Sequence, residues 1–268
     1  MSGLASLALA LLVSAGPADA SPEESSPTLR ARDTAELGPK GSWSIGLFDP
    51  AKLSLSDQVE FEVHPILFPV APNLVLRVGH GSAGAWRFAG EYGVSMPTPA
   101  LGLFKGFLFP SWDKSNGQIG WFVVPSLGLV ASRPFREADA LTLRLDGALG
   151  IPLSRNDATA LMSVAPLNVL LAPVFSGWRA RLGALYDLSL HPRWRIRAWV
   201  NLWTHGAQPS YFTTEAGLGV DLRIGRYSRL TLGAAWWNDD EHEIDAKTHE
   251  RVRSNSFWPS LDFIWAGF

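Results

Sequence analysis

The residues with the most evident catalytic potential are His80 and Ser82, which are separated only by Gly81. Side chains two positions apart share one face of a β-strand, so the imidazole of His80 could accept the hydroxyl proton of Ser82. His80 would then be the general base and Ser82 the nucleophile of a hydrolase. Two features argue against this role. Residues 81–84 have a turn-like sequence, and Glu91, which could orient the imidazole, belongs to the opposite face of its own strand. The sequence therefore does not indicate an enzyme.

A second group of reactive side chains lies in the acidic stretch 238–255. Its potential ligands are Asp239, Asp240, Glu241, His242, Glu243, Asp245 and His249. Such a set could bind Ca²⁺ or another divalent ion. The spacing matches no EF-hand loop, and charged external loops are ordinary, so we expect a solvated loop with no metal ion and no cofactor. The chain contains no cysteine, which excludes disulfides and thiolate metal sites.

A third group consists of arginines in the segments 178–188 and 194–203, which are joined by His191-Pro192. Apolar and polar residues alternate in both segments, which predicts a β-hairpin with one apolar and one cationic face. The cationic face carries Arg179, Arg181, Arg193, Arg195 and Arg197. Each arm is close to the ~9–11 residues that a tilted strand needs to cross a bilayer. A membrane barrel explains both faces, because lipid covers the outside and water fills the lumen.

The same alternation continues through most of the chain. The further candidate strands are 42–48, 59–64, 74–79, 86–95, 97–109, 119–131, 141–149, 160–172, 215–223, 229–236 and 256–268. Bacterial barrels have an even number of strands, so we predict an all-β protein with one transmembrane antiparallel β-barrel of about 12 strands. Either 42–48, which is short, or 97–109, which begins Pro-Thr-Pro, has to drop out. Pro125, Pro166 and Pro259 fall inside apparent strands, so each needs a bulge or a strand end. A soluble two-sheet protein is the alternative fold, because it could place these prolines on its edges.

The predicted inner face carries charges of both signs. The lumen-lining candidates are Arg179, Arg181, Arg193, Arg195, Arg197, Glu215, Asp221 and Arg223, together with Glu60, Glu62, Arg77, Arg87, Glu91, Arg144, Asp146, Asp187 and Arg229. One interpretation is a ladder of ion pairs that fills a narrow interior. The other is a pore for small solutes, in which the local excess of arginine between residues 179 and 197 favours anions. About twelve strands leave a modest bore that long arginines could plug.

The N-terminal region differs in composition from the predicted barrel. Residues 4–15 form an apolar run of signal-peptide length, and Ala18-Asp19-Ala20 provides a cleavage pattern. We therefore expect a cleaved signal peptide at 1–20, a disordered lead-in at 21–41 and the barrel at 42–268. No other stretch reaches 18 uninterrupted apolar residues, so no transmembrane helix is expected. The net charge of −2 argues against a nucleic-acid partner.

The C-terminal sequence FWPSLDFIWAGF ends in Phe268. Here the chain resembles the bacterial outer-membrane β-barrel proteins, whose last strand ends in an aromatic residue that the assembly machinery reads. Ile264 and Ala266 keep the phase of that pattern, whereas Ser260 and Asp262 depart from it. Residues 48–78 also look like the opening of some uncharacterised outer-membrane barrels. The resemblance implies a location in the cell outer membrane, with the bilayer, lipopolysaccharide and the assembly machinery as partners.

This resemblance also suggests a topology and a ranking of functions. With the C-terminus in the periplasm, we expect 132–139, 205–211 and 239–255 to be external, and 189–192 and 225–228 to be periplasmic turns. Passive passage of small anionic solutes ranks first. A structural or adhesive surface barrel that displays residues 239–255 ranks second. A lipid hydrolase ranks third, since outer-membrane lipid hydrolases use a His-x-Ser pair like His80 and Ser82 on the lipid-facing wall.

Overall fold

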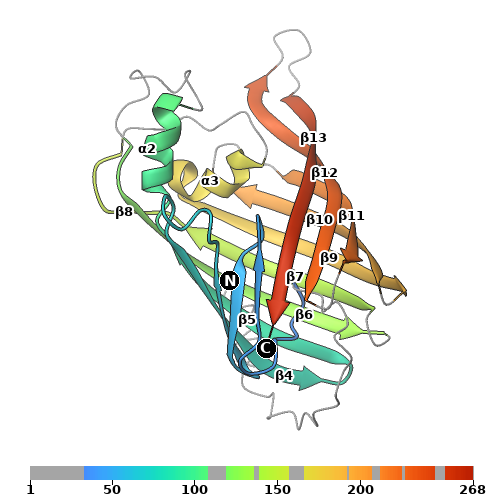
Figure 1. Cartoon of the computed structure of the whole chain (residues 1–268). Helices are drawn as coiled ribbons and strands as arrows, with labels where there is room; N and C mark the ends of the chain where they lie inside the picture. Colours follow the sequence, from blue (N-terminus) through green and yellow to red (C-terminus); the bar gives the residue numbers. More distant parts are fainter. Residues whose placement is uncertain are drawn as a thin grey trace.

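The computed structural model describes residues 33–107, 119–135, 139–156, 166–191, 193–206, 212–224, 227–244 and 251–267. Thirteen strands form one antiparallel sheet; β8 lies outside the ring, and the remaining twelve close into a barrel (Figure 1). The strands of the ring are β1 (Trp43–Gly46), β2 (Ala51–Ser56), β3 (Val59–Val63), β4 (Asn73–Ala83), β5 (Trp86–Ser95), β6 (Phe122–Pro134), β7 (Ala140–Leu149), β9 (Trp178–His191), β10 (Trp194–His205), β11 (Thr213–Arg223), β12 (Ser228–Ile244) and β13 (Arg251–Gly267). The additional elements are β8 (Ile151–Pro152), α2 (Thr98–Phe107) and α3 (Leu167–Ser176). The predicted fold class and strand number are confirmed.

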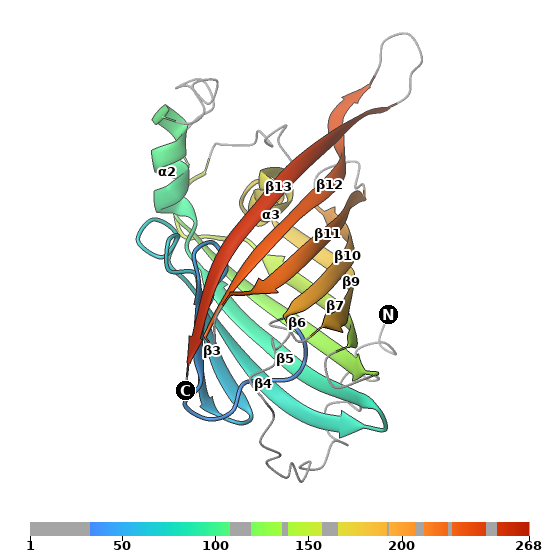
Figure 2. The ribbon, with the colours of Figure 1, turned by 45° about the vertical axis from the view of Figure 1, so that its right-hand side comes forward.

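The ring closes where the first strand meets the last. Trp43–Gly46 of β1 pairs with Ile264–Gly267 of β13, and the pairing of β5 with β6 joins the two halves of the sheet. The wall is uneven in height, because β1 has 4 residues whereas β12 and β13 have 17 each. Figure 2 shows β12 and β13 rising beyond the neighbouring strands.

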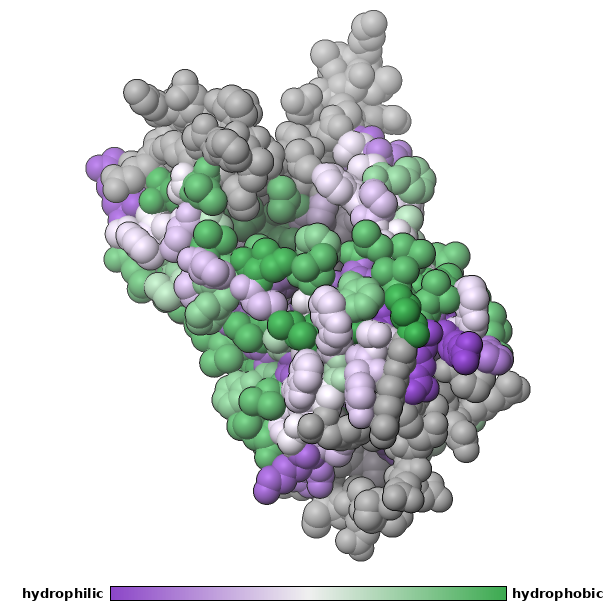
Figure 3. All heavy atoms as spheres, in the orientation of Figure 1, coloured by the Kyte–Doolittle hydropathy of each residue, from purple (hydrophilic) through white to green (hydrophobic). Residues whose placement is uncertain are grey.

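Strand register separates an apolar outer wall from a polar inner wall. Paired residues lie on the same face of a sheet, so the pairing of Leu145 with Leu182 places both on one side. Both leucines are exposed, whereas Asp187 and Arg195 on the other face are 0% and 1% exposed. Figure 3 shows many hydrophobic residues on the face of the barrel that is in view. This is the pattern of a barrel that faces lipid outside and polar groups inside.

The connections differ in length between the two ends of the barrel. At one end, which we call the turn end, the connections are 57–58, 84–85, 135–139, 192–193 and 224–227. At the other end, the loop end, they are 47–50, 64–72, 96–121, 150–177, 206–212 and 245–250. Short turns at one end and longer loops at the other are typical of outer-membrane barrels.

The number of strands is as predicted, but their identity differs from the sequence prediction. Residues 98–107 form helix α2 and residues 167–176 form helix α3, so 97–109 and 160–172 do not supply strands; residues 157–165 lie outside the described part. Residues 51–56 form β2, a strand that was not expected from the sequence. A short run that is apolar on both faces has no period that distinguishes strand from helix, which explains the error over α3.

Two predicted connections also need correction. Because α3 replaces a strand, the connection 135–139 lies at the same end as 189–193, and the Ser189 amide donates to Asp139 Oδ1 at 2.7 Å. The stretch 132–139 is therefore not at the end opposite to 189–192. The predicted loop 239–255 is also shorter, because β12 continues to Ile244 and β13 begins at Arg251.

The three prolines lie where a missing amide hydrogen is tolerated. Pro125 is at the interruption between the β6–β8 and β6–β7 ladders. Pro166 is the N-cap residue of α3 and is not in a strand. Pro259 lies in β13 above the four residues that pair with β1, so no described strand lies on that edge. Pro125 is therefore at an interruption of strand pairing and Pro259 is on an unpaired strand edge, two settings in which a strand tolerates proline.

Candidate functional site: the barrel lumen

The lumen contains part of the chain's own N-terminal region. We call residues 33–38 the N-terminal segment; within it Thr34, Ala35 and Leu37 are buried. The Ala35 amide donates to Ser132 Oγ at 2.7 Å, and the Arg77 guanidinium donates to the carbonyl oxygen of Thr34. The sequence predicts a disordered lead-in here. The inner wall orders residues 33–38 because it supplies hydrogen-bonding partners for their backbone groups.

On one side the N-terminal segment contacts a network of charges on β2 to β7. Arg77 is 1% exposed, and its guanidinium lies 2.9 Å from Glu60 and 3.2 Å from Glu91. Glu91 is also 3.0 Å from Arg144. Lys52 lies 2.7 Å from Glu62. Buried charges are tolerated when each has an opposite partner, and this network meets that condition.

On the opposite side the N-terminal segment contacts the arginine-rich wall of β9 and β10. Arg197 Nη2 donates to Asp33 Oδ2 at 2.5 Å, and Arg197 Nε lies 3.2 Å from Asp187 Oδ1. Burial raises the pKa of Asp33. The positive charges of Arg197, Lys52 and Arg144 outweigh this effect and bring the pKa well below its ordinary value. Asp33 is therefore a carboxylate at neutral pH, and it acts as a counter-ion from inside the lumen.

Arg195 is one of the poorly satisfied side chains of this wall. It is 1% exposed, and among the described residues its Nε and Nη1 atoms have no hydrogen-bond partner. The negative charges of Asp187 and Asp221 favour the charged form of the Arg195 guanidinium. Asp221 itself lies 3.2 Å from Arg229. Arg195 thus has carboxylates nearby, but these two donors have no acceptor among the described residues.

The loop-end half of the lumen is filled by α3 and by tryptophans. Val169 of α3 is fully buried against Trp203, Ala235 and Trp237, and the rings of Trp203 and Trp237 stack with centroids 6.4 Å apart. Glu215 accepts hydrogen bonds from the indole nitrogens of Trp199 and Trp203 and from the amide of Asn201. Arg179 and Arg181 lie over the Trp203 ring, at 5.5 and 4.8 Å from its centroid.

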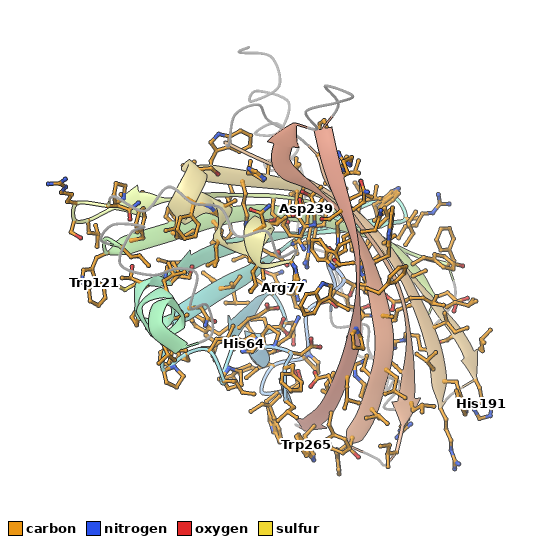
Figure 4. The ribbon with its side chains drawn as sticks, turned by 90° about the horizontal axis from the view of Figure 1, so that it is seen from above. His64, Arg77, Trp121, His191, Asp239 and Trp265 are labelled. Carbon is orange, nitrogen blue, oxygen red and sulfur yellow. The ribbon has the colours of Figure 1, made fainter. Side chains whose placement is uncertain are left out.

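Polar contacts fix the position of α3. Asn168 Nδ2 donates to Asp239 Oδ2 at 3.0 Å, and Thr213 Oγ1 donates to Asp239 Oδ1 at 2.6 Å. The far side of α3 packs through Val174 on Leu101 of α2 and Phe122 of β6. Viewed from above, Arg77 and Asp239 lie within the ring of strands, whereas His191 and Trp265 lie at its outside (Figure 4). The N-terminal segment and α3 are therefore two separate elements that occupy the lumen.

The lumen residues expected from the sequence fall into two groups. Arg179, Arg181, Arg195, Arg197, Glu215 and Asp221 are all on the inner face. Arg193 and Arg223 are at the turn end, where the Arg223 amide donates to the Arg193 carbonyl oxygen at 2.9 Å. Asp33, Lys52 and α3 were not expected in the lumen. No pattern marks Asp33, because it lies in a polar stretch without periodicity.

His80 and Ser82 do not share a face. The register shifts between Gly79 and Gly81, so His80 is the extra residue of a β-bulge. His80 Nε2 lies 3.4 Å from the hydroxyl of Tyr92 on the outer wall, whereas Ser82 pairs with Arg87 on the inner face. Glu91 is bound to Arg77 and Arg144. Neither His80 nor Glu91 is therefore placed to act as a base for the Ser82 hydroxyl.

The other predicted sites are only partly described. Of the candidate ligands in the acidic stretch, Asp239 is the one whose side chain is described, and it contacts Asn168 and Thr213; the remaining candidates lie outside the described side chains. Within the described ranges no group of three or more metal-ligating residues comes together. None of the described helices is both long and apolar enough to cross a membrane.

Comparisons with known proteins identify no family. No protein-family model matches the chain, and no curated protein matches it. Among solved structures it is similar to in-vitro folded OmpT, an outer-membrane protein of Vibrio cholerae, at 9% identity and a TM-score of 0.41, covering 84% of this chain and 64% of that one. Outer-membrane expressed OmpT gives 9% identity and a TM-score of 0.42, with 81% and 64% covered. The P. putida toluene transporter TodX gives 10% identity and a TM-score of 0.30, with 84% and 77% covered. The chain thus spans less than two thirds of the length of the OmpT chains.

Proposed function

We propose that this chain is an outer-membrane barrel that passes small anionic solutes, and that the N-terminal segment closes its lumen until it is displaced. The observation that carries the proposal is the Asp33 carboxylate held on Arg197 inside the barrel. The periplasm lies at the turn end in this proposal, because periplasmic turns are the shorter connections of such barrels.

The charge of the wall explains the preference for anions. Arg179, Arg181, Arg195 and Arg197 of β9 and β10 lie on the inner face, where Asp187 is the carboxylate of the same two strands. When the N-terminal segment is in place, Asp33 offsets part of this positive charge. Its departure leaves a local excess of arginine, and a ring of positive charge selects for anions.

An unobstructed bore is not part of the proposal. The N-terminal segment occupies the turn-end half of the lumen, and α3 packs on Trp203 and Trp237 in the loop-end half. The first is held by charged and polar contacts and the second by apolar packing. Displacement of the N-terminal segment is therefore the step that we expect to control passage.

Ion selectivity in planar bilayers tests the proposal. The reversal potential across a KCl gradient is measured for the wild type, for Asp33→Asn and for Asp33→Asn combined with Arg195→Gln. We expect the Asp33→Asn barrel to conduct, with a reversal potential of the sign that indicates anion selectivity. The reason is that the wall keeps its arginines but loses their counter-ion. Adding Arg195→Gln should shift the potential towards the unselective value.

Glu36→Gln is the matched control, since Glu36 pairs with Arg87 at a site where both side chains are about half exposed. Exposed pairs contribute little, so this variant should behave as the wild type. Heat-modifiable gel mobility establishes that each variant is folded. A folded Asp33→Asn barrel that is silent or prefers cations would contradict the proposal.

A further inference from the structure

We infer that Arg195 and Arg197 form a binding site for a small carboxylate anion, and that Asp33 is a built-in ligand that occupies it. This inference rests on the proposed function, because it names the class of solute that the lumen recognises. Among the arginines of β9 and β10, it assigns ligand binding to Arg195 and Arg197.

The first observation is the geometry at Arg197. Its Nη2 atom donates to Asp33 Oδ2, and its Nε atom faces Asp187, so one guanidinium lies between two carboxylates. Asp187 belongs to the wall and is 0% exposed, whereas Asp33 belongs to the N-terminal segment. The carboxylate at the Asp33 position is thus the one that can leave without unfolding a strand.

The second observation is the unsatisfied guanidinium of Arg195. It lies two residues from Arg197 on the same face of β10, and its Nε and Nη1 atoms have no hydrogen-bond partner within the described residues. A buried guanidinium with unused donors is costly, and a planar carboxylate can bind a guanidinium through two parallel hydrogen bonds. A free carboxylate that replaces Asp33 could therefore contact both arginines, whereas Asp33 is restrained by its backbone.

Hydrogen bonds from the barrel wall to its backbone hold the N-terminal segment in place. Arg77 binds the carbonyl oxygen of Thr34, and Ser132 accepts from the Ala35 amide. A free ligand has to compete with this tethered carboxylate, and a tethered group acts at an effective concentration of the order of millimolar. We therefore expect weak apparent binding in the wild type and tighter binding once Asp33 is neutralised.

A single introduced cysteine measures the displacement. The chain contains no cysteine, and Ala35 is a buried small residue of the N-terminal segment, so Ala35→Cys is a unique and conservative probe. Its reaction rate with a water-soluble maleimide is followed in the folded protein as succinate is added, with sodium chloride at matched ionic strength in parallel. We expect succinate to raise the rate several-fold and to reach a plateau, and chloride to raise it less.

Two further variants locate the effect. In Ala35→Cys with Arg195→Gln, Asp33 keeps its partner Arg197, so the basal rate should stay low while the response to succinate is lost. In Ala35→Cys with Asp33→Asn, the basal rate should already be high, and calorimetry should show tighter succinate binding than in the wild type. Ala83→Cys, at the exposed end of β4, should react at the same rate with and without succinate.

The outcomes separate this inference from the proposed function. Equal rates with succinate and chloride would show charge screening only and would overturn the carboxylate site. An unchanged succinate response in the Arg195→Gln variant would also overturn it. If either of these two results were found together with anion-selective conductance, the proposed function would still hold. A succinate response in a barrel that never conducts would support the carboxylate site but contradict the proposed function.

Discussion

The two halves of the lumen are filled in physically different ways. In the turn-end half, the N-terminal segment is held by charged side chains, among them Arg77 and Arg197, and by backbone hydrogen bonds. In the loop-end half, α3 is held by apolar packing of Val169 on Trp203 and by the buried contact of Asn168 with Asp239. One filling is a short piece of chain that enters the barrel ahead of its first strand, whereas the other is a helix tied to strands on both sides.

This difference indicates which element can move. Ionic contacts in a wet lumen are weakened by salt and by competing ions, but burial of apolar surface is not. A segment that leaves the lumen exposes few apolar groups, whereas a displaced α3 would expose its apolar residues to water. The turn-end half is therefore suited to gating, whereas α3 in the loop-end half is expected to stay in place.

The largest effect is expected for Arg197→Ala. The substitution removes the partner that Asp33 and Asp187 share. Asp187 is fully buried, and breaking a buried ion pair costs about 3–5 kcal/mol, whereas the Asp33 side chain is 40% exposed and its pair contributes less. The free energy of unfolding, measured by urea titration in lipid vesicles, should fall by about that amount. Arg193→Ala, at an exposed residue, should change it by less than about 0.5 kcal/mol. Equal losses in the two variants would show that the wall does not depend on this network.

The second effect concerns Asp33→Asn, which removes a charged hydrogen bond worth about 1.5–3 kcal/mol. The maleimide reaction of Ala35→Cys should accelerate at least about tenfold, because 1.4 kcal/mol corresponds to a factor of about ten. A cysteine in place of Ala172 of α3, which is fully buried, should not change its rate in the same background. If both cysteines became reactive together, the two fillings would be one cooperative unit.

A third variant, Val169→Ala, tests the apolar half alone. Val169 is fully buried, and the loss of two methyl groups with the resulting cavity costs about 2 kcal/mol. The unfolding free energy should fall by this amount, while the Ala35→Cys rate should remain that of the wild type. A faster reaction at position 35 would mean that α3 and the N-terminal segment are coupled.

The smallest effect is that of salt. Raising the ionic strength from about 0.1 M to 1 M shortens the screening length from about 10 to 3 Å, which weakens the contacts of Asp33 more than the packing of α3. The Ala35→Cys rate should rise a few-fold, and the Ala172→Cys rate should be constant. A salt response at Ala172 as large as that at Ala35 would contradict the distinction between the two halves.

The contrast between the halves also explains what the sequence could predict. The strand faces follow from alternation, because lipid selects apolar side chains on one side of each strand. Residues such as Arg195, Arg197 and Asp221 could therefore be assigned to the inner face by their position in that pattern. The strand number came out right because two segments that form helices were among the thirteen candidates, while β2 was missed and one candidate was expected to drop out.

The contents of the lumen could not be predicted in the same way. Asp33 and Ala35 are ordered by residues far away along the chain, such as Arg197 and Ser132, and no local period records such contacts. Helix α3 is largely apolar, with Asn168 as a buried polar residue, and this composition also fits a strand with two apolar faces. The bulge at His80 likewise depends on the register with β5.

The measurement that decides most directly whether the N-terminal segment closes the barrel is the open probability of single barrels in a planar bilayer. Wild type, Asp33→Asn and Glu36→Gln are compared under identical salt and voltage. We expect the wild type and Glu36→Gln to be closed most of the time and Asp33→Asn to be open most of the time. Equal open probabilities for the three folded proteins would show that the Asp33–Arg197 contact does not control the lumen.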